Sequence, residues 1–144
     1  MKTVRDLLKQ KGREVWAIGP DSTVYDALKV MAEKNIGALL VIDAGRPVGI
    51  FSERDYARQV ILKGKASKDT PVREVMTSKV VFVRPEQSIE ECMALMTDKR
   101  FRHLPILEEG ALVGILSIGD VVKAVISEKD FLIEQLANYI SSGG

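Results

Sequence analysis

One seven-residue pattern occurs twice in the chain, as Gly-Ile-Phe-Ser-Glu-Arg-Asp at 49–55 and as Gly-Ile-Leu-Ser-Ile-Gly-Asp at 114–120. In both places an apolar, strand-like run stops at a serine, and an aspartate follows three residues later. Serine with an acidic residue at this spacing is typical of a helix start. The pattern therefore predicts a strand-to-helix turn at each site.

The repeat extends well beyond these two turns. Residues 15–64 align with 80–129 at a shift of 65 residues without a gap. The preceding segments VRDLL at 4–8 and VREVM at 72–76 also match, but at a shift of 68, so the first copy has three extra residues near its start. This unit is too long for most solenoid repeats, and two copies predict a pseudo-symmetric pair.

Each copy is predicted to have the order β-α-β-β-α. In the first copy we expect a strand at 15–18, a helix from residue 24, a hairpin of strands at 38–42 and 48–51, and a helix from Ser52. The first helix begins after Thr23, which has capping-box spacing to Asp26. The hairpin turns at Gly45, which tolerates positive φ. On the last helix we expect Tyr56, Val60 and Ile61 to face inward.

The fold class is therefore α/β, with two such repeats packed as a pair and an extra C-terminal amphipathic helix. We expect three segments: 1–66 as the first repeat with an N-terminal helix, 67–130 as the second repeat, and 131–144 as a helical extension. In the extension, Leu132, Leu136 and Ile140 form an apolar stripe with no place inside the repeat. This stripe indicates a partner surface, and we expect a homodimer.

The composition is that of a globular protein, with 46% hydrophobic and 28% charged residues among 144. A net charge of +1 gives no strong attraction to nucleic acid or acidic membranes. No apolar run approaches the ~20 residues that span a bilayer, and charges interrupt the N-terminal segment where a secretory signal would be apolar. The single cysteine, Cys92, excludes an internal disulfide and fits a reducing compartment. We expect a cytoplasmic protein without a nucleic-acid or membrane partner.

The order of elements, the two G-hydrophobic-x-S-x-x-D turns and the strand HLPIL at 103–107 together resemble the CBS-domain family over nearly the whole chain. The chain looks like a stand-alone tandem pair, which is called a Bateman module. The resemblance implies a regulatory module, not an enzyme, that senses energy or redox state by binding an adenosine-containing ligand in clefts between the repeats. AMP, ADP, ATP or NAD(H) are the expected ligands; S-adenosylmethionine is less favoured because it gives no reason to keep Arg54.

The resemblance also implies the site residues. The matching aspartate holds the ribose, the matching serine lies near ribose or phosphate, and the first strand of the opposite repeat cups the adenine. One expected cleft consists of Ser117, Gly119 and Asp120 with Trp16 to Ile18 and Gly37; the other consists of Ser52, Arg54 and Asp55 with Thr77 and Val81 to Val83. Arg102 and His103 stand, in reversed order, where one family member has a phosphate-contacting His-Arg pair, whereas the first repeat has Gly37-Ala38 there.

Two interpretations of the turns stay open. Helix capping alone explains the serines and aspartates, and a structural dimerisation module with empty clefts would need nothing more. Capping does not explain Gly119, which costs a helix ~1 kcal/mol against alanine and would let a ligand approach the backbone. It does not explain Arg54 either, whose guanidinium suits a phosphate at a helix N-terminus. These two residues favour a ligand.

The remaining conspicuous residues are assigned no catalytic or metal role. His103 is the only histidine, which excludes a histidine cluster for a metal, and a packed or phosphate-facing role is expected. A Ser–His nucleophile would need a third, orienting group, and the sequence has no such motif. Cys92 is expected in the core, and Trp16 either in the core or stacked on adenine. The regulated protein target stays unknown.

Overall fold

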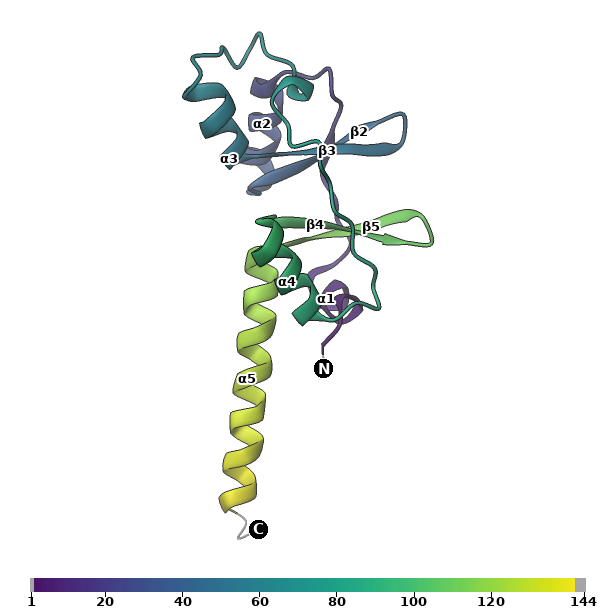
Figure 1. Cartoon of the computed structure of the whole chain (residues 1–144), viewed down its shortest axis with the longest axis vertical. Coiled ribbons are helices and arrows are strands. Elements are labelled where there is room, and N and C mark those ends of the chain that lie inside the picture. Colours follow the sequence, from purple (N-terminus) through teal and green to yellow (C-terminus); the bar gives the residue numbers. More distant parts are fainter. Residues whose placement is uncertain (1, 142–144) are drawn as a thin grey trace. The chain divides into compact units, whose positions relative to one another are not determined.

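The computed structural model describes residues 2–141 and divides into two compact units. Residues 15–80 form one, here called the first-repeat unit; residues 1–14 and 81–144 form the other, called the second-repeat unit. The N-terminal helix, which the sequence analysis placed with the first repeat in 1–66, thus lies in the second-repeat unit. In Figure 1 this helix, at the purple end of the scale, lies beside the green elements.

The first-repeat unit contains a three-stranded sheet of order β1-β2-β3, in which β1 is parallel to β2 and β2 is antiparallel to β3. Its strands are β1 Ala17–Ile18, β2 Ala38–Asp43 and β3 Arg46–Ser52. Its helices are α2 Val24–Lys34, α3 Glu53–Asp55, the π-helix η1 Tyr56–Ile61 and the 3₁₀-helix η2 Val72–Glu74. The first strand is shorter than the sequence predicted.

The second-repeat unit contains the antiparallel pair of β4 His103–Glu108 and β5 Ala111–Ser117. Its helices are α1 Val4–Lys11, α4 Ile89–Lys99 and α5 Ile118–Ser141. At the place of β1, Val83 makes a single parallel bridge to Ile106. The predicted α/β class with two related repeats and a C-terminal helix is confirmed, although the first strand of the second repeat is reduced to this bridge.

The repeated segments that contain α1 and η2, residues 4–11 and 72–77 and here called the exchanged segments, are exchanged between the two sequence repeats. Arg5 on α1 pairs with Glu86, with 3.0 Å between guanidinium nitrogen and carboxylate oxygen. The matching Arg73 on η2 pairs with Asp21, which is the counterpart of Glu86 at the 65-residue shift. The helix that opens the first sequence repeat, α1, therefore belongs to the second-repeat unit. The helix that opens the second sequence repeat, η2, belongs to the first-repeat unit.

Each unit has its own hydrophobic core, and the exchanged segments contribute to both. The core of the first-repeat unit consists of Val24, Ala27, Met31, Leu39, Val41, Phe51, Val60, Val72 and Val75. The core of the second-repeat unit consists of Val4, Leu7, Leu8, Val83, Ile89, Cys92, Met96, Leu104, Ile106, Leu116, Val121 and Ala124. Because α1 supplies three of these side chains, it is an integral part of its unit.

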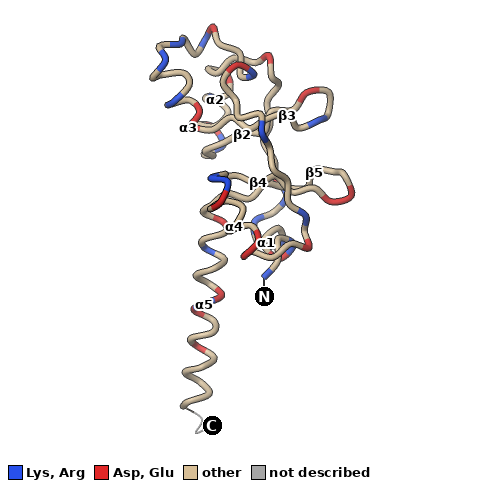
Figure 2. The backbone as a smooth tube through the Cα atoms, in the orientation of Figure 1, with Lys and Arg blue, Asp and Glu red and all other residues tan. Residues whose placement is uncertain are grey.

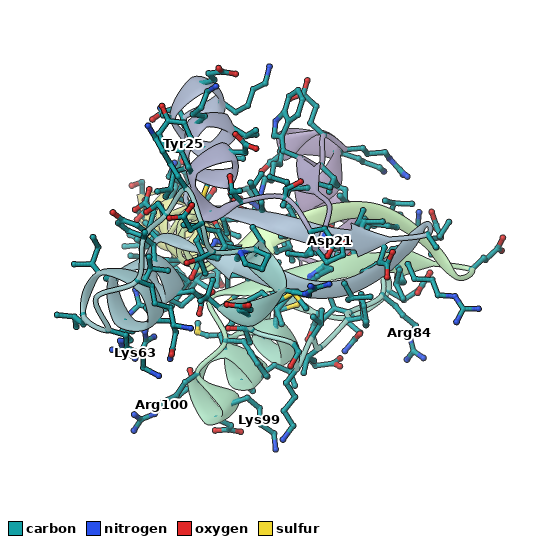
Figure 3. All side chains as sticks on the ribbon, turned by 90° about the horizontal axis from the view of Figure 1, so that it is seen from above. Asp21, Tyr25, Lys63, Arg84, Lys99 and Arg100 are labelled. Atoms are coloured by element: carbon teal, nitrogen blue, oxygen red, sulfur yellow. The ribbon has the colours of Figure 1, made fainter. Side chains whose placement is uncertain are left out.

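The local turn and cap signals of the sequence are confirmed. Gly45 has φ +79° and Ala44 has φ +50°, as a two-residue hairpin turn that follows the strand twist requires. Thr23 Oγ1 accepts a hydrogen bond from the backbone N–H of Asp26 at 3.1 Å, so it caps α2. Helix α4 is the counterpart of α2 in the second repeat, and it ends at Arg100, which has φ +59°. Figure 3 shows the side chains of Lys99 and Arg100 pointing outward from the ribbon.

The helices after the two turns differ from expectation in two ways. Ile61 was predicted to face inward, but 55% of it is exposed. The reason is that 56–61 form a π-helix, whose wider turn changes the angle between successive side chains. Val60 is buried as predicted. In the second copy, α5 runs without a break from Ile118 to Ser141. The helix is therefore not interrupted at residue 131, where the sequence analysis placed a boundary. Residues 142–144 lie outside the described residues.

Candidate functional site

The turn at Ser52 is a complete capping box between β3 and α3. The Asp55 backbone N–H donates to Ser52 Oγ at 3.2 Å, and the Ser52 backbone N–H donates to Asp55 Oδ2 at 3.0 Å. The hydroxyl of Ser52 also donates to the same carboxylate oxygen at 3.0 Å. The capping interpretation therefore describes the local geometry of this turn.

The turn at Ser117 repeats this arrangement at the start of α5. The Asp120 backbone N–H donates to Ser117 Oγ at 3.2 Å, and the Ser117 N–H donates to Asp120 Oδ2 at 2.8 Å. His103 lies opposite Ser117 in the β4–β5 register, and the Arg102 carbonyl accepts from the Ile118 N–H at 2.9 Å. The second-repeat unit thus brings Arg102 and His103 to the Ser117 turn.

The glycine that opens each motif is required by packing. A Cβ at Gly49 would lie 2.5 Å from Met76 Sδ and 2.9 Å from the Thr77 carbonyl oxygen. A Cβ at Gly114 would lie 2.6 Å from Leu8 Cδ2. Both clashes are with the exchanged segments, so these glycines let those segments approach the hairpins closely.

Gly119, in contrast, is not required by packing. A Cβ at this position would meet only Ser117 Oγ, at 3.6 Å, which is an ordinary van der Waals contact. Its φ is also not in the left-handed region, since the positive-φ glycines among the described residues are Gly12, Gly45, Gly64 and Gly110. An alanine would fit at the start of α5.

Thr77 lies at the Ser52 turn. Its backbone N–H donates to the Ile50 carbonyl at 2.8 Å, and its carbonyl accepts from the Ile50 N–H at 2.9 Å. This pairing fixes Thr77 beside β3, where its hydroxyl donates to Asp55 Oδ1 at 3.0 Å. The Asp55 carboxylate therefore receives a neutral donor from the exchanged segment of its own unit.

Asp120 pairs with a lysine ammonium group, where Asp55 has the hydroxyl of Thr77. Lys11 Nζ at the end of α1 donates to Asp120 Oδ2 and to the Ile115 carbonyl oxygen, both at 2.6 Å. Burial raises the pKa of Asp120, but the hydrogen bonds from Lys11 and from the Ser117 backbone outweigh it and hold that pKa below its ordinary value. Sequence reasoning missed Lys11, because it falls in the stretch of the first copy that has no counterpart in the second.

The residues of the first repeat that were predicted to surround the adenine differ in how accessible they are. Trp16 is 37% exposed, and Lys34 Nζ lies 4.2 Å from the centroid of its ring. Ile18 packs against the core of the first-repeat unit. Gly37 lines a hollow of about 300 Å³ in that unit, together with Leu28, Met31, Ala32, Asn35, Ile36 and Glu53. Of the three, Trp16 and Gly37 are accessible.

In the second repeat, Val83 is fully buried, so its side chain is not available to a ligand. Its N–H donates to the Pro105 carbonyl at 3.0 Å, and its carbonyl accepts from the Leu107 N–H at 2.9 Å. Val81 packs against the core of the same unit. Val83 therefore mainly supports β4, and Val81 contributes to the core. Which segments of the two units meet at one ligand stays a prediction of the sequence.

The described residues, 2–141, contain no cluster of three or more His, Cys, Asp or Glu side chains that could hold a metal ion. In the same range there is no helix that is both long and apolar enough to cross a membrane. Cys92 is buried as predicted, and burial, with Glu91 and Glu90 nearby, raises the pKa of its thiol to about 11. At neutral pH this thiol is protonated and unreactive.

Comparison with known proteins places this geometry in a family. The CBS-domain family model matches residues 4–61 and again 72–131. The CBS domain-containing protein CBSX3, mitochondrial, of Arabidopsis thaliana is 41% identical over 98% of this chain and 73% of its own length. A solved protein with CBS domains from Burkholderia ambifaria, described as a candidate signal-transduction protein, is 53% identical and covers 88% of this chain and 95% of its own, with a TM-score of 0.84.

A hexameric CBS-CP12 protein from bloom-forming cyanobacteria has the same fold, with 30% identity and a TM-score of 0.76 over 84% of this chain and 70% of its own. Proteins with CBS-domain pairs are generally regulatory, ligand-binding modules. The two matches of the family model cover nearly the whole chain and coincide with the two sequence repeats. The chain therefore belongs to the CBS-domain family and contains a tandem pair of CBS domains.

Proposed function

We propose that this chain is a regulatory module, without enzymatic activity, that binds an adenine nucleotide at the Ser52–Asp55 and Ser117–Asp120 turns. The observation that carries the proposal is Gly119. Neither packing nor backbone conformation requires glycine there, although glycine costs a helix up to ~1 kcal/mol against alanine. A ligand that lies against the first turn of α5 gives that glycine a purpose.

The aspartates are suited to hold a ribose even though they cap helices. A carboxylate has about four lone-pair sites, and a cap occupies only part of them. Within residues 2–141, the hydrogen bonds of the Asp120 side chain all involve Oδ2. Oδ1 is then the atom that would accept from a ribose hydroxyl, so capping and ligand binding are compatible.

The phosphate would lie at the helix N-termini. The start of a long helix such as α5 carries a partial positive charge. Its Ile118 and Asp120 N–H groups are already paired, so the Gly119 N–H is the one that would donate to a phosphate. Arg54, in the first helical turn after Ser52, adds a guanidinium at one site, whereas the matching position after Ser117 is Gly119. We therefore favour AMP, ADP, ATP or NAD(H) over S-adenosylmethionine, which has no phosphate.

A co-purified ligand would test this function directly. Denaturation of the purified protein should release material that absorbs at 260 nm and that mass spectrometry identifies as an adenine nucleotide. Protein freed of ligand should melt at a higher temperature when AMP, ATP or NAD is added. If denaturation releases no such material and none of the three nucleotides raises the melting temperature, the structural dimerisation module is the better description.

We also propose that the chain forms a homodimer through α5, in the cytosol. Six large apolar side chains of α5 are each 55–74% exposed: Phe131, Leu132, Ile133, Leu136, Tyr139 and Ile140. Among them, Leu132, Leu136, Tyr139 and Ile140 have the i, i+4, i+7 and i+8 spacing of one helix face, and an exposed apolar face of this kind is typical of an interaction site. Figure 2 shows that the end of α5 carries no charged residue, so a second copy of the same helix is the expected occupant.

Light scattering at micromolar concentration tests the homodimer. We expect about twice the 15.9 kDa of one chain. Leu136→Glu should give the monomer, because it places a charge within the apolar patch. Asn138→Glu, two residues away on the polar side of α5, is the matched control and should leave the dimer intact. A wild-type mass of one chain, or dissociation by both variants, would contradict the proposal.

A further inference from the structure

The two turns differ in what the exchanged segment presents to the aspartate. In the first-repeat unit, the Thr77 hydroxyl donates to Asp55 Oδ1 at 3.0 Å, while the cap uses Oδ2. In the second-repeat unit, Lys11 Nζ donates to Asp120 Oδ2, the same oxygen that the cap uses. One carboxylate therefore meets a neutral donor and the other a charged one.

The pair of Lys11 and Asp120 is partly shielded from solvent. The Lys11 side chain is 34% exposed and the Asp120 side chain 24%. Lys11 is also held by the Ile115 carbonyl on β5, so its ammonium group is fixed by two acceptors. A pair at this exposure is stronger than a typical surface ion pair, but it is weak enough for a ligand to displace.

We propose that Lys11 competes with the ligand for Asp120, so that this site binds an adenine nucleotide more weakly than its residues alone would allow. The inference rests on the proposed function, since it concerns the same ribose-binding carboxylate. A ribose presents two hydroxyls. One can donate to Asp120 Oδ1, but the second needs Oδ2, whose two lone pairs already accept from Lys11 Nζ and from the Ser117 N–H. A ribose that uses both carboxylate oxygens therefore displaces the ammonium group.

The place of Lys11 in the chain gives the displacement a consequence. Lys11 is the last residue of α1, and Gly12 caps that helix with φ +94°. The chain then passes from the second-repeat unit into the first-repeat unit after residue 14. Removal of Lys11 from Asp120 and Ile115 releases the end of α1 where the chain leaves the unit. Nucleotide at this site would thus free the end of α1, whereas nucleotide at Asp55 would not.

Isothermal titration with AMP tests the competition in the Asp55→Ala background, which leaves only the Asp120 site. Lys11→Met should raise the affinity for AMP about three- to tenfold, the gain expected when a partly exposed charge pair no longer opposes binding. Lys11→Arg keeps the charge and should bind as the parent does. Lys9→Met removes the same charge from the same helix, but Lys9 acts on Asp6 rather than Asp120, so its affinity should not change.

Each outcome supports or overturns the inference. An unchanged or lower affinity of Lys11→Met overturns it, and a lower one would make Lys11 a ligand-holding residue instead. Should Lys11→Met fail to fold, as judged by its melting temperature, Lys11→Gln keeps a polar donor at this position and carries the same expectation. If neither the wild type nor any variant binds AMP, ATP or NAD, the proposed function itself fails; if all bind but Lys11→Met gains nothing, only this inference fails.

Discussion

Within the repeated heptapeptide, each residue has a separate physical cause. The opening glycines, Gly49 and Gly114, make room for the exchanged segments. The serines and aspartates close capping boxes at the helix starts. The position before the aspartate is Arg54 in one copy and Gly119 in the other, and neither the capping box nor the packing explains Gly119. The proposed ligand would explain this glycine.

The three glycines should differ in what alanine costs. Gly49→Ala should destabilise most, by about 1–3 kcal/mol, because its Cβ meets the Thr77 carbonyl, which the bridge to Ile50 holds in place. Gly114→Ala should cost less, since the clash is with the end of the flexible Leu8 side chain. Gly119→Ala should be neutral or stabilising by up to ~1 kcal/mol. Urea titrations measure this order.

Gly119→Ala then serves a second purpose. If the glycine exists for a ligand, this variant keeps its stability but loses affinity for AMP at the Asp120 site. Retained affinity together with higher stability would remove the main support for the proposed function.

Asp55→Ala and Asp120→Ala separate capping from ribose binding. If the aspartates only cap, each change costs the ligand-free protein about 0.5–2 kcal/mol, and AMP still raises the melting temperature as before. A ligand at 100 times its dissociation constant stabilises by about 2.7 kcal/mol, which is roughly 5–10 °C for a domain of this size. If they hold ribose, the loss of two charge-assisted bonds weakens binding by about 3 kcal/mol. The shift due to the mutated site should then nearly vanish in scanning fluorimetry.

At the scale of elements, the sequence predicted best what depends on near neighbours. The hairpin turn at Gly45 and the cap at Thr23 follow from residues within four positions, and both are present. The exchange of α1 and η2 was missed, because it depends on which of two similar hairpins each segment packs against. The pairing of Lys11 with Asp120 was missed for the same reason, because it joins residues 109 positions apart in the sequence. The π-helix at 56–61 was also not predicted.

The exchange of α1 and η2 predicts where core mutations act. Leu7 on α1 and its repeat counterpart Val75 are both buried, in different units. Leu7→Ala should cost about 2–5 kcal/mol and Val75→Ala somewhat less, because fewer atoms are removed. In hydrogen-exchange mass spectrometry, Leu7→Ala should reduce the protection of β4 and β5, whereas Val75→Ala should reduce that of β2 and β3. Loss of protection in β2 and β3 on Leu7→Ala would contradict the exchange.

At the scale of the whole molecule, the two repeats have the same order of elements but differ in the helix that follows each turn and in the residues at each turn. The first-repeat unit continues from its turn into a π-helix, and the second into a long α-helix with an exposed apolar end. The Asp55 turn carries Arg54 and Thr77, and the Asp120 turn carries Gly119 and Lys11. Because these differences lie at the proposed ligand sites, the two sites should differ in affinity and in ligand preference.

Calorimetric titration of the whole protein should therefore resolve two classes of site for ATP. The Asp55 site should favour the ligand with more phosphate charge, because Arg54 offers a guanidinium fork to phosphate oxygens at the start of α3. Arg54→Ala should weaken the binding of ATP by roughly ten- to a hundredfold, the equivalent of one lost charge-assisted hydrogen bond, and the binding of AMP by clearly less.

Arg58→Ala is the matched control, since Arg58 is an exposed arginine one turn further along the same helical segment. It removes the same charge from the molecule and should leave both ligands unaffected. Equal losses of AMP and ATP on Arg54→Ala, or the same loss on Arg58→Ala, would mean that Arg54 acts only through the overall charge and that the Asp55 site does not select for phosphate.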